Sequence, residues 1–169
     1  AINCFRDAVF LDKDSEIYLL HFGSALVMDG RLKKAVSAYS RFLRDYPDNP
    51  NVLFELGNAF LRSGEFESAS RAYQSAAKYS PQSPQIQSAL GIAYTYLERL
   101  DDAADVYRTA ISLGASDAET HFNLGLIYLR LERSDKALLA FRTALEIDPD
   151  HQRSYRNIGH ELVRVAQFE

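Results

Sequence analysis

The chain has 169 residues, 47% hydrophobic and 25% charged, and carries a formal net charge of −4. This composition is typical of a folded, helix-rich protein, and no low-complexity or disordered tract stands out. The weak negative charge lacks the basic footprint of a nucleic-acid-binding surface, so nucleic acid is disfavoured as a partner. Cys4 is the only cysteine, which excludes an intramolecular disulfide and a cysteine-rich zinc site. No apolar run reaches the roughly 18–20 residues of a membrane span.

Amphipathic helical segments follow one another along the chain, bounded by residues that start or stop a helix. Apolar residues recur at steps of three and four, as at Leu53, Leu56 and Phe60. Pro50 stands at a first helical position, and Pro81 lies where a helix must stop. The expected N-caps are Ser15, Asn49, Ser83 and Asp117. The expected helices span residues 2–11, 17–29, 32–45, 51–63, 66–79, 85–97, 100–113, 119–131, 134–147 and 153–166.

A glycine recurs every 34 residues, once in every second helix of the series. An alanine follows each of the first four glycines after 12 residues, and a tyrosine or phenylalanine follows after 16. Counted backwards, Ala1 and Phe5 occupy the same two positions of a preceding unit. Each 34-residue unit therefore reads as a hairpin of a first helix and a second helix. The glycines are Gly23, Gly57, Gly91, Gly125 and Gly159; the alanines are Ala35, Ala69, Ala103 and Ala137; the aromatic residues are Tyr39, Tyr73, Tyr107 and Phe141.

The repeat glycine needs a physical reason, because a glycine in a helix interior costs about 1 kcal/mol relative to alanine. We expect the glycine of each first helix to face the alanine of the second helix, since two small residues let the backbones approach closely. Leu56, Phe60 and Tyr73 would then interlock around the contact at Gly57 and offset its conformational cost, because burying one large side chain contributes about 1.5–3 kcal/mol.

This spacing resembles the tetratricopeptide repeat (TPR) family. "LFELGNAF", "ALGIAYTY" and "FNLGLIYL" match the first helix of its motif, and "SASRAYQSAAKYSP" and "KALLAFRTALEIDP" match the second. The resemblance covers essentially the whole chain without a gap. It implies an all-α fold, a right-handed superhelical solenoid of helix-turn-helix hairpins, and a role in binding other proteins.

Residues 1–169 form a single array when they are counted by repeat position. The complete repeats are 16–49, 50–83, 84–117 and 118–151. Residues 1–15 match the second helix of a preceding repeat, and 152–169 match the first helix of a further repeat or a C-terminal cap.

The two outer segments would leave apolar faces unpaired, whereas natural arrays usually end in polar caps. Three explanations remain open: the natural chain continues, the final helix is a cap, or the lone helices of two molecules pair end to end. The chain begins at Ala1 rather than at methionine, which suggests a processed product or an excised fragment. No signal peptide is recognised, so the cytoplasm is the default compartment.

No sequence motif points to catalysis, a cofactor or a metal site. A glycine-rich phosphate loop, a paired-histidine zinc motif and a nucleophile elbow are all missing. The four histidines are dispersed, and His121 takes a position of the repeat that Leu19 and Leu53 occupy elsewhere, so it is expected to pack. Cys4 lies on an apolar stretch and is expected to be a core residue rather than a nucleophile. We therefore expect a protein that is not an enzyme.

The TPR resemblance implies that the first helices line a concave groove. Positions three and two residues before each glycine, and one, four and five after it, would face this groove. The surface so defined is apolar at first and basic towards the C-terminus, which suits a segment with apolar anchors and an acidic part. The candidate groove residues are Phe54, Asn58, Arg62, Tyr96, Phe122, Asn123, Arg130, Arg153, Arg156, Asn157 and His160.

The basic end of the groove is a candidate site for an acidic or carboxylate-ended partner; the alternative is a solvated charged face. The cluster comprises Arg130, Arg153, Arg156 and Arg164, with Asn123 and Asn157. The carboxylate clamp with which some family members hold acidic chaperone tails is not reproduced. Counted from Gly57 only Asn58 fits it, and counted from Gly91 only Asn123 and Arg153 fit.

The sequence thus predicts an adaptor or scaffold that binds a peptide or partner protein in a concave groove. The alternatives are an accessory arm of a larger enzyme, such as a glycosyltransferase or kinase, and a self-assembling unit that stacks end to end as a homo-oligomer. An RNA-reading helical repeat is disfavoured by the acidic balance.

Overall fold

A computed structural model describes residues 15–115 and 117–166, and this part of the chain is helical with no strand. Each helix lies within one residue of its expected bounds, so the all-α hairpin fold is confirmed. The expected helix at 2–11 lies outside the described residues. The helices are α2 (Glu16–Met28), α3 (Leu32–Asp45), α4 (Pro50–Arg62), α5 (Phe66–Tyr79), α6 (Pro84–Tyr96), α7 (Leu100–Ser112), α8 (Ala118–Arg130), α9 (Ser134–Ile147) and α10 (Gln152–Ala166).

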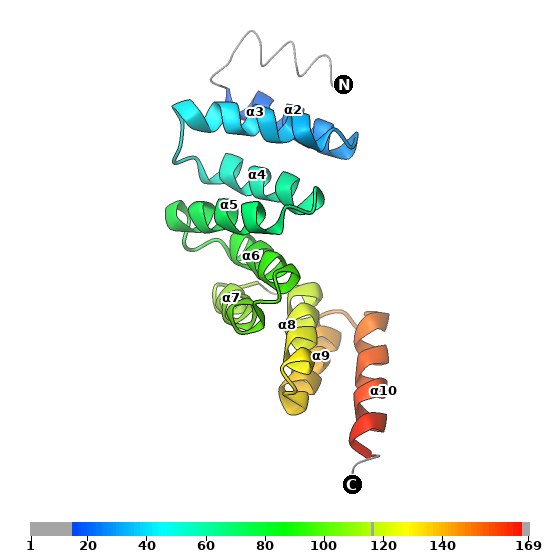
Figure 1. The fold of residues 1–169 in the computed structure, drawn as a ribbon. Helices are drawn as coiled ribbons and strands as arrows, with labels where there is room; N and C mark the ends of the chain where they lie inside the picture. The colour runs from blue at the N-terminus through cyan, green and yellow to red at the C-terminus, as the bar shows by residue number, and fades with distance from the viewer. Residues whose placement is uncertain (1–14, 116, 167–169) are drawn as a thin grey trace. The chain divides into compact units, whose positions relative to one another are not determined.

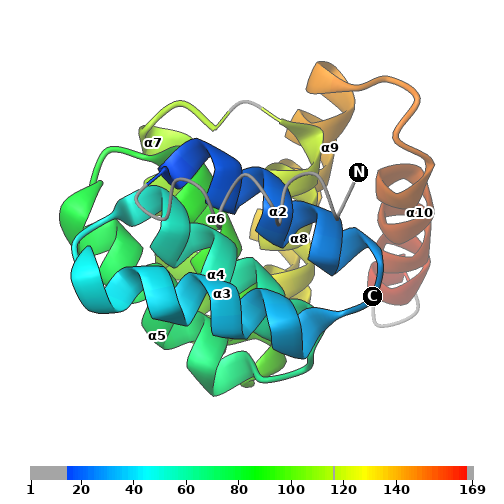
Figure 2. The same cartoon turned by 90° about the horizontal axis from the view of Figure 1, so that it is seen from above.

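The helices belong to two compact units, unit 1 (Ala1–Gln82) and unit 2 (Ser83–Glu169). In unit 1, α2 pairs with α3 and α4 pairs with α5, and α3 packs on α4. In unit 2, α6 pairs with α7 and α8 pairs with α9, while α7 packs on α8 and α9 packs on α10. The two helices of each hairpin lie side by side in both views (Figure 1, Figure 2).

The repeat glycine packs against an aromatic ring, and the alanine expected to face it is not among its nearest neighbours. A Cβ atom added to Gly57 would lie 2.5 Å from a ring carbon of Tyr73, and its three nearest neighbours would all be atoms of that ring. The ring of Tyr73 is fully buried, and it occupies the volume that a side chain at Gly57 would need. The same arrangement occurs at Gly23 with Tyr39, at Gly91 with Tyr107 and at Gly125 with Phe141.

Small and large residues share the core of each hairpin. The alanines at the second repeat position are fully buried, as are the aromatic rings that lie one helical turn further on. Tyr73 also satisfies its hydroxyl group, which donates a hydrogen bond of 2.7 Å to Asn58 Oδ1. Burial raises the pKa of the Tyr73 phenol above its usual value, so the ring stays neutral in the core.

Side-chain caps start three of the first helices as the sequence predicts. Asn49 Oδ1 accepts from the backbone N–H of Val52 at 3.0 Å, and Asp117 Oδ1 accepts from the N–H of Thr120 at 2.8 Å. Ser83 makes the equivalent contact at 3.4 Å. Ser15 is the N-cap residue of α2 as predicted, but its side chain makes no capping hydrogen bond.

The turn inside each hairpin has one residue with positive φ, seven positions after the repeat glycine. This residue is Gly64 in one hairpin, with φ of 79°, and it is Glu98 and Glu132 in two others, with φ of 59° and 57°. The next residue donates its N–H back into the first helix, as Arg133 does to the Tyr128 carbonyl at 2.8 Å. This repeated turn brings acidic side chains to the C-terminal ends of α6 and α8.

Because of the glycine–ring contact, we expect alanine substitution to have opposite effects on stability at two glycines of the same repeat position. Gly57→Ala should lower the free energy of unfolding by about 1–3 kcal/mol, because the new methyl group overlaps the buried Tyr73 ring. Gly159→Ala should raise it by about 0.5–1 kcal/mol, because nothing lies within 4 Å of that site and alanine favours the helix. Urea unfolding followed by circular dichroism measures both effects. Equal destabilisation by the two changes would contradict the contact.

Candidate functional site

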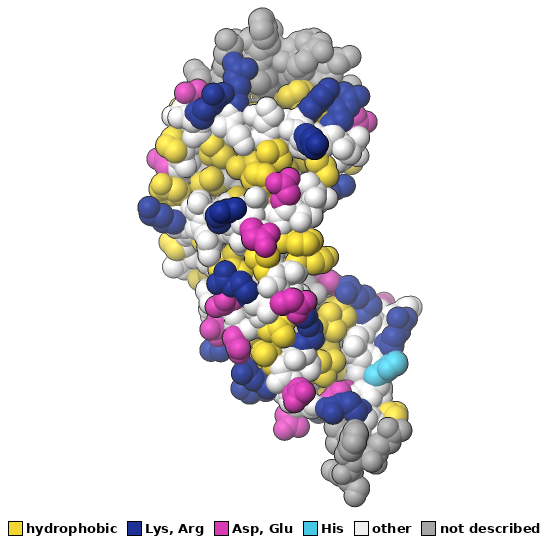
Figure 3. Space-filling model, viewed as in Figure 1, with side chains coloured by type: hydrophobic (Ala, Val, Ile, Leu, Met, Phe, Trp, Pro, Cys, Tyr) yellow, Lys and Arg dark blue, Asp and Glu magenta, His cyan; other side chains and the backbone are white. Residues whose placement is uncertain are grey.

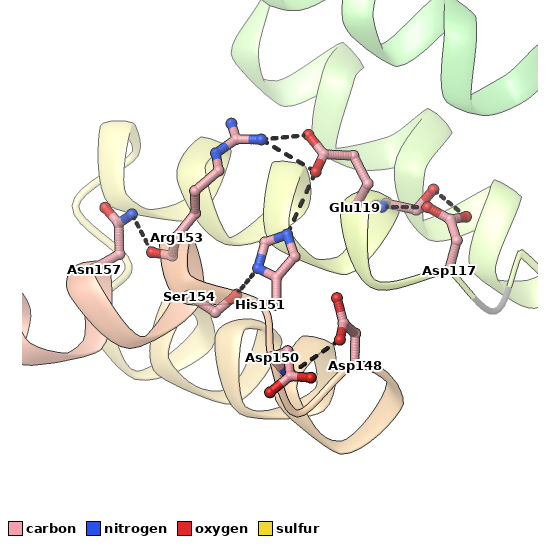
Figure 4. Close-up of polar contacts among 9 residues, drawn as sticks. Asp117, Glu119, Asp148, Asp150, His151, Arg153, Ser154 and Asn157 are labelled. Carbon is pink, nitrogen blue, oxygen red and sulfur yellow. Dashed lines mark hydrogen bonds and ion pairs between the residues drawn. The ribbon is translucent and has the colours of Figure 1, made fainter.

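Polar contacts connect the first helices of unit 2 to one another. The hydroxyl groups of Ser88 on α6 and Thr120 on α8 lie 3.2 Å apart. Arg153 at the start of α10 donates hydrogen bonds of 2.9 and 3.1 Å to the Glu119 carboxylate on α8 (Figure 4). The faces of α6, α8 and α10 therefore adjoin, in the order that a surface built from first helices requires.

A row of three polar side chains lies at the junction of α8 and α10: Glu119, His151 and Ser154 (Figure 4). His151 Nε2 is 3.4 Å from Glu119 Oε2, and His151 Nδ1 is 2.8 Å from Ser154 Oγ. The order carboxylate–histidine–serine is that of a hydrolase relay, but such a relay needs an accessible hydroxyl group. Ser154 is fully buried, so a substrate has no access to its hydroxyl. The row is therefore best explained as the polar start of α10.

Phe122 is a core residue, so its assignment to the groove surface is wrong. Its side chain is 2% exposed, and its ring lies 5.6 Å from the Phe141 ring. The Arg153 guanidinium covers the ring at 4.2 Å, and the His151 ring packs at 5.0 Å. The cation–π contact and the bond to Glu119 together hold Arg153 over Phe122.

Three arginines of the predicted basic cluster are already paired with carboxylates of this chain. Arg130 pairs with Glu98, Arg153 with Glu119 and Arg164 with Glu161. An acidic ligand would have to compete with these carboxylates, which weakens the attraction expected from the sequence. Among the described residues, Arg156 is exposed and takes part in no ion pair.

The pair formed by Glu161 and Arg164 lies at the contact between α10 and α9. Glu161 is 5% exposed, and Arg164 donates hydrogen bonds of 2.6, 3.0 and 3.2 Å to its carboxylate. Arg164 also donates a bond of 2.6 Å to Ser134 Oγ at the start of α9. Hydrogen bonds from Arg164 and then Ser134 lower the pKa of the Glu161 carboxyl. The equivalent buried positions of α4 and α8 are held by Ala59 and Ile127.

A recess of about 560 Å³ opens beside this ion pair, between the end of α8 and α10. It is lined by Leu129, Glu132, Glu161 and Arg164. Hydrophobic side chains gather over α8 and alongside α10 on the face shown in Figure 3, with basic and acidic side chains around them. The recess thus combines an apolar wall with a charged rim, as peptide-binding surfaces often do.

The other predicted groove residues vary in exposure and belong to both units. In unit 2, Tyr96 is 59% exposed, His160 is exposed and Asn123 is half-buried. Asn157 is half-buried and donates a hydrogen bond of 2.9 Å to the Arg153 carbonyl of its own helix.

In unit 1, Phe54 and Asn58 are half-buried and both contact Tyr73: the Phe54 ring lies 5.7 Å from the Tyr73 ring, and Asn58 accepts the Tyr73 hydroxyl. Arg62 is exposed at the end of α4. These contacts place Phe54 and Asn58 against the hairpin core, with part of each side chain left at the surface.

Sequence reasoning missed the carboxylates that pair with the arginines. The partners are 32 residues apart for Glu98 and Arg130, and 34 apart for Glu119 and Arg153. Such a separation is close to one repeat, so acidic and basic residues at nearly equal repeat positions are the signal that could have revealed these pairs.

The described residues contain no group of three histidine, cysteine, aspartate or glutamate side chains placed to hold a metal ion. Within the same part of the chain, no helix has the length and apolar character needed to cross a membrane.

A family model described as tetratricopeptide repeat matches residues 1–50, 54–118 and 88–151. The chain belongs to the tetratricopeptide repeat family. A search of curated proteins found no match. The hairpins, the repeat glycines and the buried rings described above are thus those of a TPR array.

Solved structures of MamA, a TPR protein, resemble this TPR chain. One crystal structure of MamA has a TM-score of 0.82 and 26% identity, and covers 85% of this chain and 84% of that chain. MamA MSR-1 has a TM-score of 0.75 and 25% identity, with 88% and 86% covered. MamA from Desulfovibrio magneticus RS-1 has a TM-score of 0.80 but 19% identity, with 89% and 85% covered, and shows the fold alone.

The family and these neighbours support a protein–protein interaction scaffold, and TPR scaffolds are generally not enzymes.

The Glu161–Arg164 pair predicts that the docking of α10 on α9 depends on pH. Because the pKa of Glu161 is lowered in the folded state, its stabilising effect is complete above the pKa of an unfolded glutamate. The effect should be lost as the pH falls through the lowered pKa of the folded state. At neutral pH, Glu161→Gln should destabilise α10 by about 1–2 kcal/mol. Amide hydrogen exchange of α10, compared between the two proteins, measures the difference.

The difference between wild type and Glu161→Gln should shrink on acidification, because protonation removes the same charge. Glu146→Gln, which changes an exposed carboxylate of α9, is the control and should leave α10 exchange unchanged. A difference that stays constant down to the most acidic pH would contradict a role for the Glu161 charge.

Proposed function

We propose that unit 2 of this TPR protein binds an extended or helical segment of a partner protein along the faces of α6, α8 and α10. The recess beside Leu129 carries this proposal, because it offers an apolar wall next to charged groups on adjoining first helices. TPR proteins bind protein partners, which supports the general role. The residues that bind the segment, and its chemistry, are the specific part of the proposal.

Apolar contacts would supply most of the affinity. Tyr96 on α6 and Val163 on α10 are each 59% exposed, so both can bury further surface on binding. Leu126 and Leu129 on α8 are half-buried and form part of the hydrophobic cluster of unit 2. A side chain of the partner that enters the recess would contact Leu129, and burying one large apolar side chain contributes about 1.5–3 kcal/mol.

The preference for an acidic or carboxylate-ended partner would come from Arg156, with His160 one turn further along α10. Arg156 needs no competing carboxylate to be displaced, in contrast to Arg130, Arg153 and Arg164. This narrows the basic cluster expected from the sequence to one arginine with a supporting histidine. Asn123 and Asn157 remain candidates for hydrogen bonds to the backbone of the bound segment.

End-to-end self-association is a second candidate role. The observation that favours it is the exposure of Tyr155 and Leu162 on α10, which lie on a different side of the helix from Val163.

Peptide selection tests the groove. Peptides selected from a random library against the whole chain should carry one or two large apolar residues and an acidic residue or a free carboxylate. Val163→Asp should reduce the affinity of these peptides at least tenfold, because it places a charge on the apolar surface. Arg156→Glu should reduce it roughly threefold to tenfold, as expected for an exposed ion pair with its charge reversed. Fluorescence anisotropy measures both affinities.

Two changes on α9 serve as matched controls. Leu139→Asp alters an apolar residue that is 66% exposed, and Arg142→Glu reverses an exposed arginine. Both should leave the affinity unchanged. If the controls and the groove variants weaken binding equally, or if no peptide is selected, the groove is not the binding surface.

A further inference from the structure

Unit 1 carries a half-buried carboxylate that has no partner. Glu55 on α4 is the only carboxylate at the predicted groove positions of the described helices, and its side chain is half-buried. Within the part of the chain that the structure describes, it forms no ion pair and no hydrogen bond. Glu16 and Glu119 differ from it, because each accepts hydrogen bonds from the start of the next first helix. A partly desolvated carboxylate without compensation favours a cation beside it.

Two buried tyrosine hydroxyl groups lie close to Glu55. After burial itself, the charge of Glu55 is the next cause that raises the pKa of the Tyr39 and Tyr73 phenols, so its carboxylate is near both. The Tyr73 hydroxyl donates to Asn58. The Tyr39 hydroxyl is buried and makes no hydrogen bond of normal geometry within the described residues, although the Ser24 hydroxyl is close enough to lower the Tyr39 pKa. Polar groups left without partners call for an explanation, and a ligand that donates hydrogen bonds supplies one.

Apolar side chains surround this carboxylate. The Phe54 ring, next to Glu55 in α4, is half-buried and lies 5.7 Å from the Tyr73 ring. Leu20 on the contacting helix α2 and Leu61 on α4 are half-buried as well. No cationic side chain of the described residues stacks on the Phe54 ring. The face therefore offers one negative charge and one aromatic ring within an apolar surround.

Unit 2 shows which side chain such a combination can hold. The Arg153 guanidinium covers the Phe122 ring at 4.2 Å and donates hydrogen bonds of 2.9 and 3.1 Å to the Glu119 carboxylate (Figure 4). Phe54 has the same repeat position as Phe122. A guanidinium is planar and presents several donors, so it can stack on a ring and bind a carboxylate at once, whereas the compact ammonium group of lysine cannot do both as well.

We propose that the α2–α4 face of unit 1 binds an arginine side chain of a partner protein, with its guanidinium paired to Glu55 and stacked on Phe54. Aliphatic residues next to this arginine in the partner segment would contact Leu20 and Leu61. The inference goes beyond the proposed function above, which concerns unit 2 and an acidic segment. It assigns unit 1 a ligand of the opposite charge.

Short peptides with arginine fixed at the centre and all other positions random serve as the probe. Peptides selected against the whole chain should carry aliphatic residues beside the arginine. Replacing the arginine by citrulline, which has nearly the same shape without the charge, should lower the affinity roughly tenfold, because a hydrogen-bonded charge pair is lost. Glu55→Gln should lower it to a similar extent. Phe54→Leu should lower it roughly twofold to fivefold through loss of the cation–π contact.

A charge exchange gives the decisive result. Glu55→Arg should abolish binding of the arginine peptides, and the same peptides with glutamate in place of arginine should bind this variant. Glu67→Gln, which alters an exposed carboxylate of α5 in the same unit, is the matched control and should leave the affinity unchanged. Fluorescence anisotropy measures the affinities, and circular dichroism checks that each variant is folded. Equal affinity for the arginine and citrulline peptides, equal effects of Glu55→Gln and Glu67→Gln, or no binding after the charge exchange would each overturn the proposal.

Variants of unit 2 separate this site from the proposed groove. Val163→Asp and Arg156→Glu should leave the arginine peptides unaffected, whereas Glu55→Gln should leave the acidic peptides of unit 2 unaffected. Arginine peptides that are lost with Val163→Asp and kept with Glu55→Gln would assign them to unit 2 and overturn the inference. Failure to select any arginine peptide would also overturn it, and would leave the groove of unit 2 to be judged by its own peptides.

Discussion

The packing of one aromatic ring on one glycine is the constraint on which each hairpin depends. The ring of Tyr73 is fully buried, and no side chain larger than hydrogen fits at Gly57 beneath it. Glycine costs its helix about 1 kcal/mol, whereas burial of a large side chain contributes about 1.5–3 kcal/mol, so the packing term dominates. The contact also sets the distance and the register between the two helices, because the ring fits only in the space above the glycine. Its recurrence in four hairpins explains why a helix-breaking residue persists in this chain.

Between hairpins, polar contacts add to apolar packing. Glu16 on α2 accepts hydrogen bonds of 2.8 and 2.7 Å from Asn49 and Asn51 at the start of α4. Glu119 on α8 accepts from Arg153 at the start of α10 in much the same way. A carboxylate on one first helix thus binds the beginning of the next. Charged residues near the first-helix face consequently hold neighbouring repeats together. Their pairing also neutralises most of the surface that the sequence suggests is basic.

Sequence periodicity predicted the fold well, because helix bounds and hairpin pairing depend on local patterns that recur without a gap. It was less successful wherever a side chain had to be matched with its neighbour in space. The repeat glycine has both an alanine and a tyrosine at fixed offsets, and spacing alone could not show that the ring of Tyr73 is the one in contact. Phe122 and Phe54 share a repeat position, yet Arg153 and His151 cover Phe122. Pairs such as Glu98 with Arg130 form across about one full repeat, which propensity and amphipathic patterns do not report.

The distance of 16 residues between Gly57 and Tyr73 has a consequence for how such a chain can change in length. An insertion or deletion within either helix, between the glycine and the ring, would turn the ring away from its glycine, since each added residue rotates a helix by about 100°. Loss or gain of a whole 34-residue unit leaves every ring on a glycine and every carboxylate beside the next helix start. Such an array can therefore lengthen by duplication of whole units. Insertions or deletions of other lengths are disfavoured because they disrupt the packing of the core, not because they alter the binding surface.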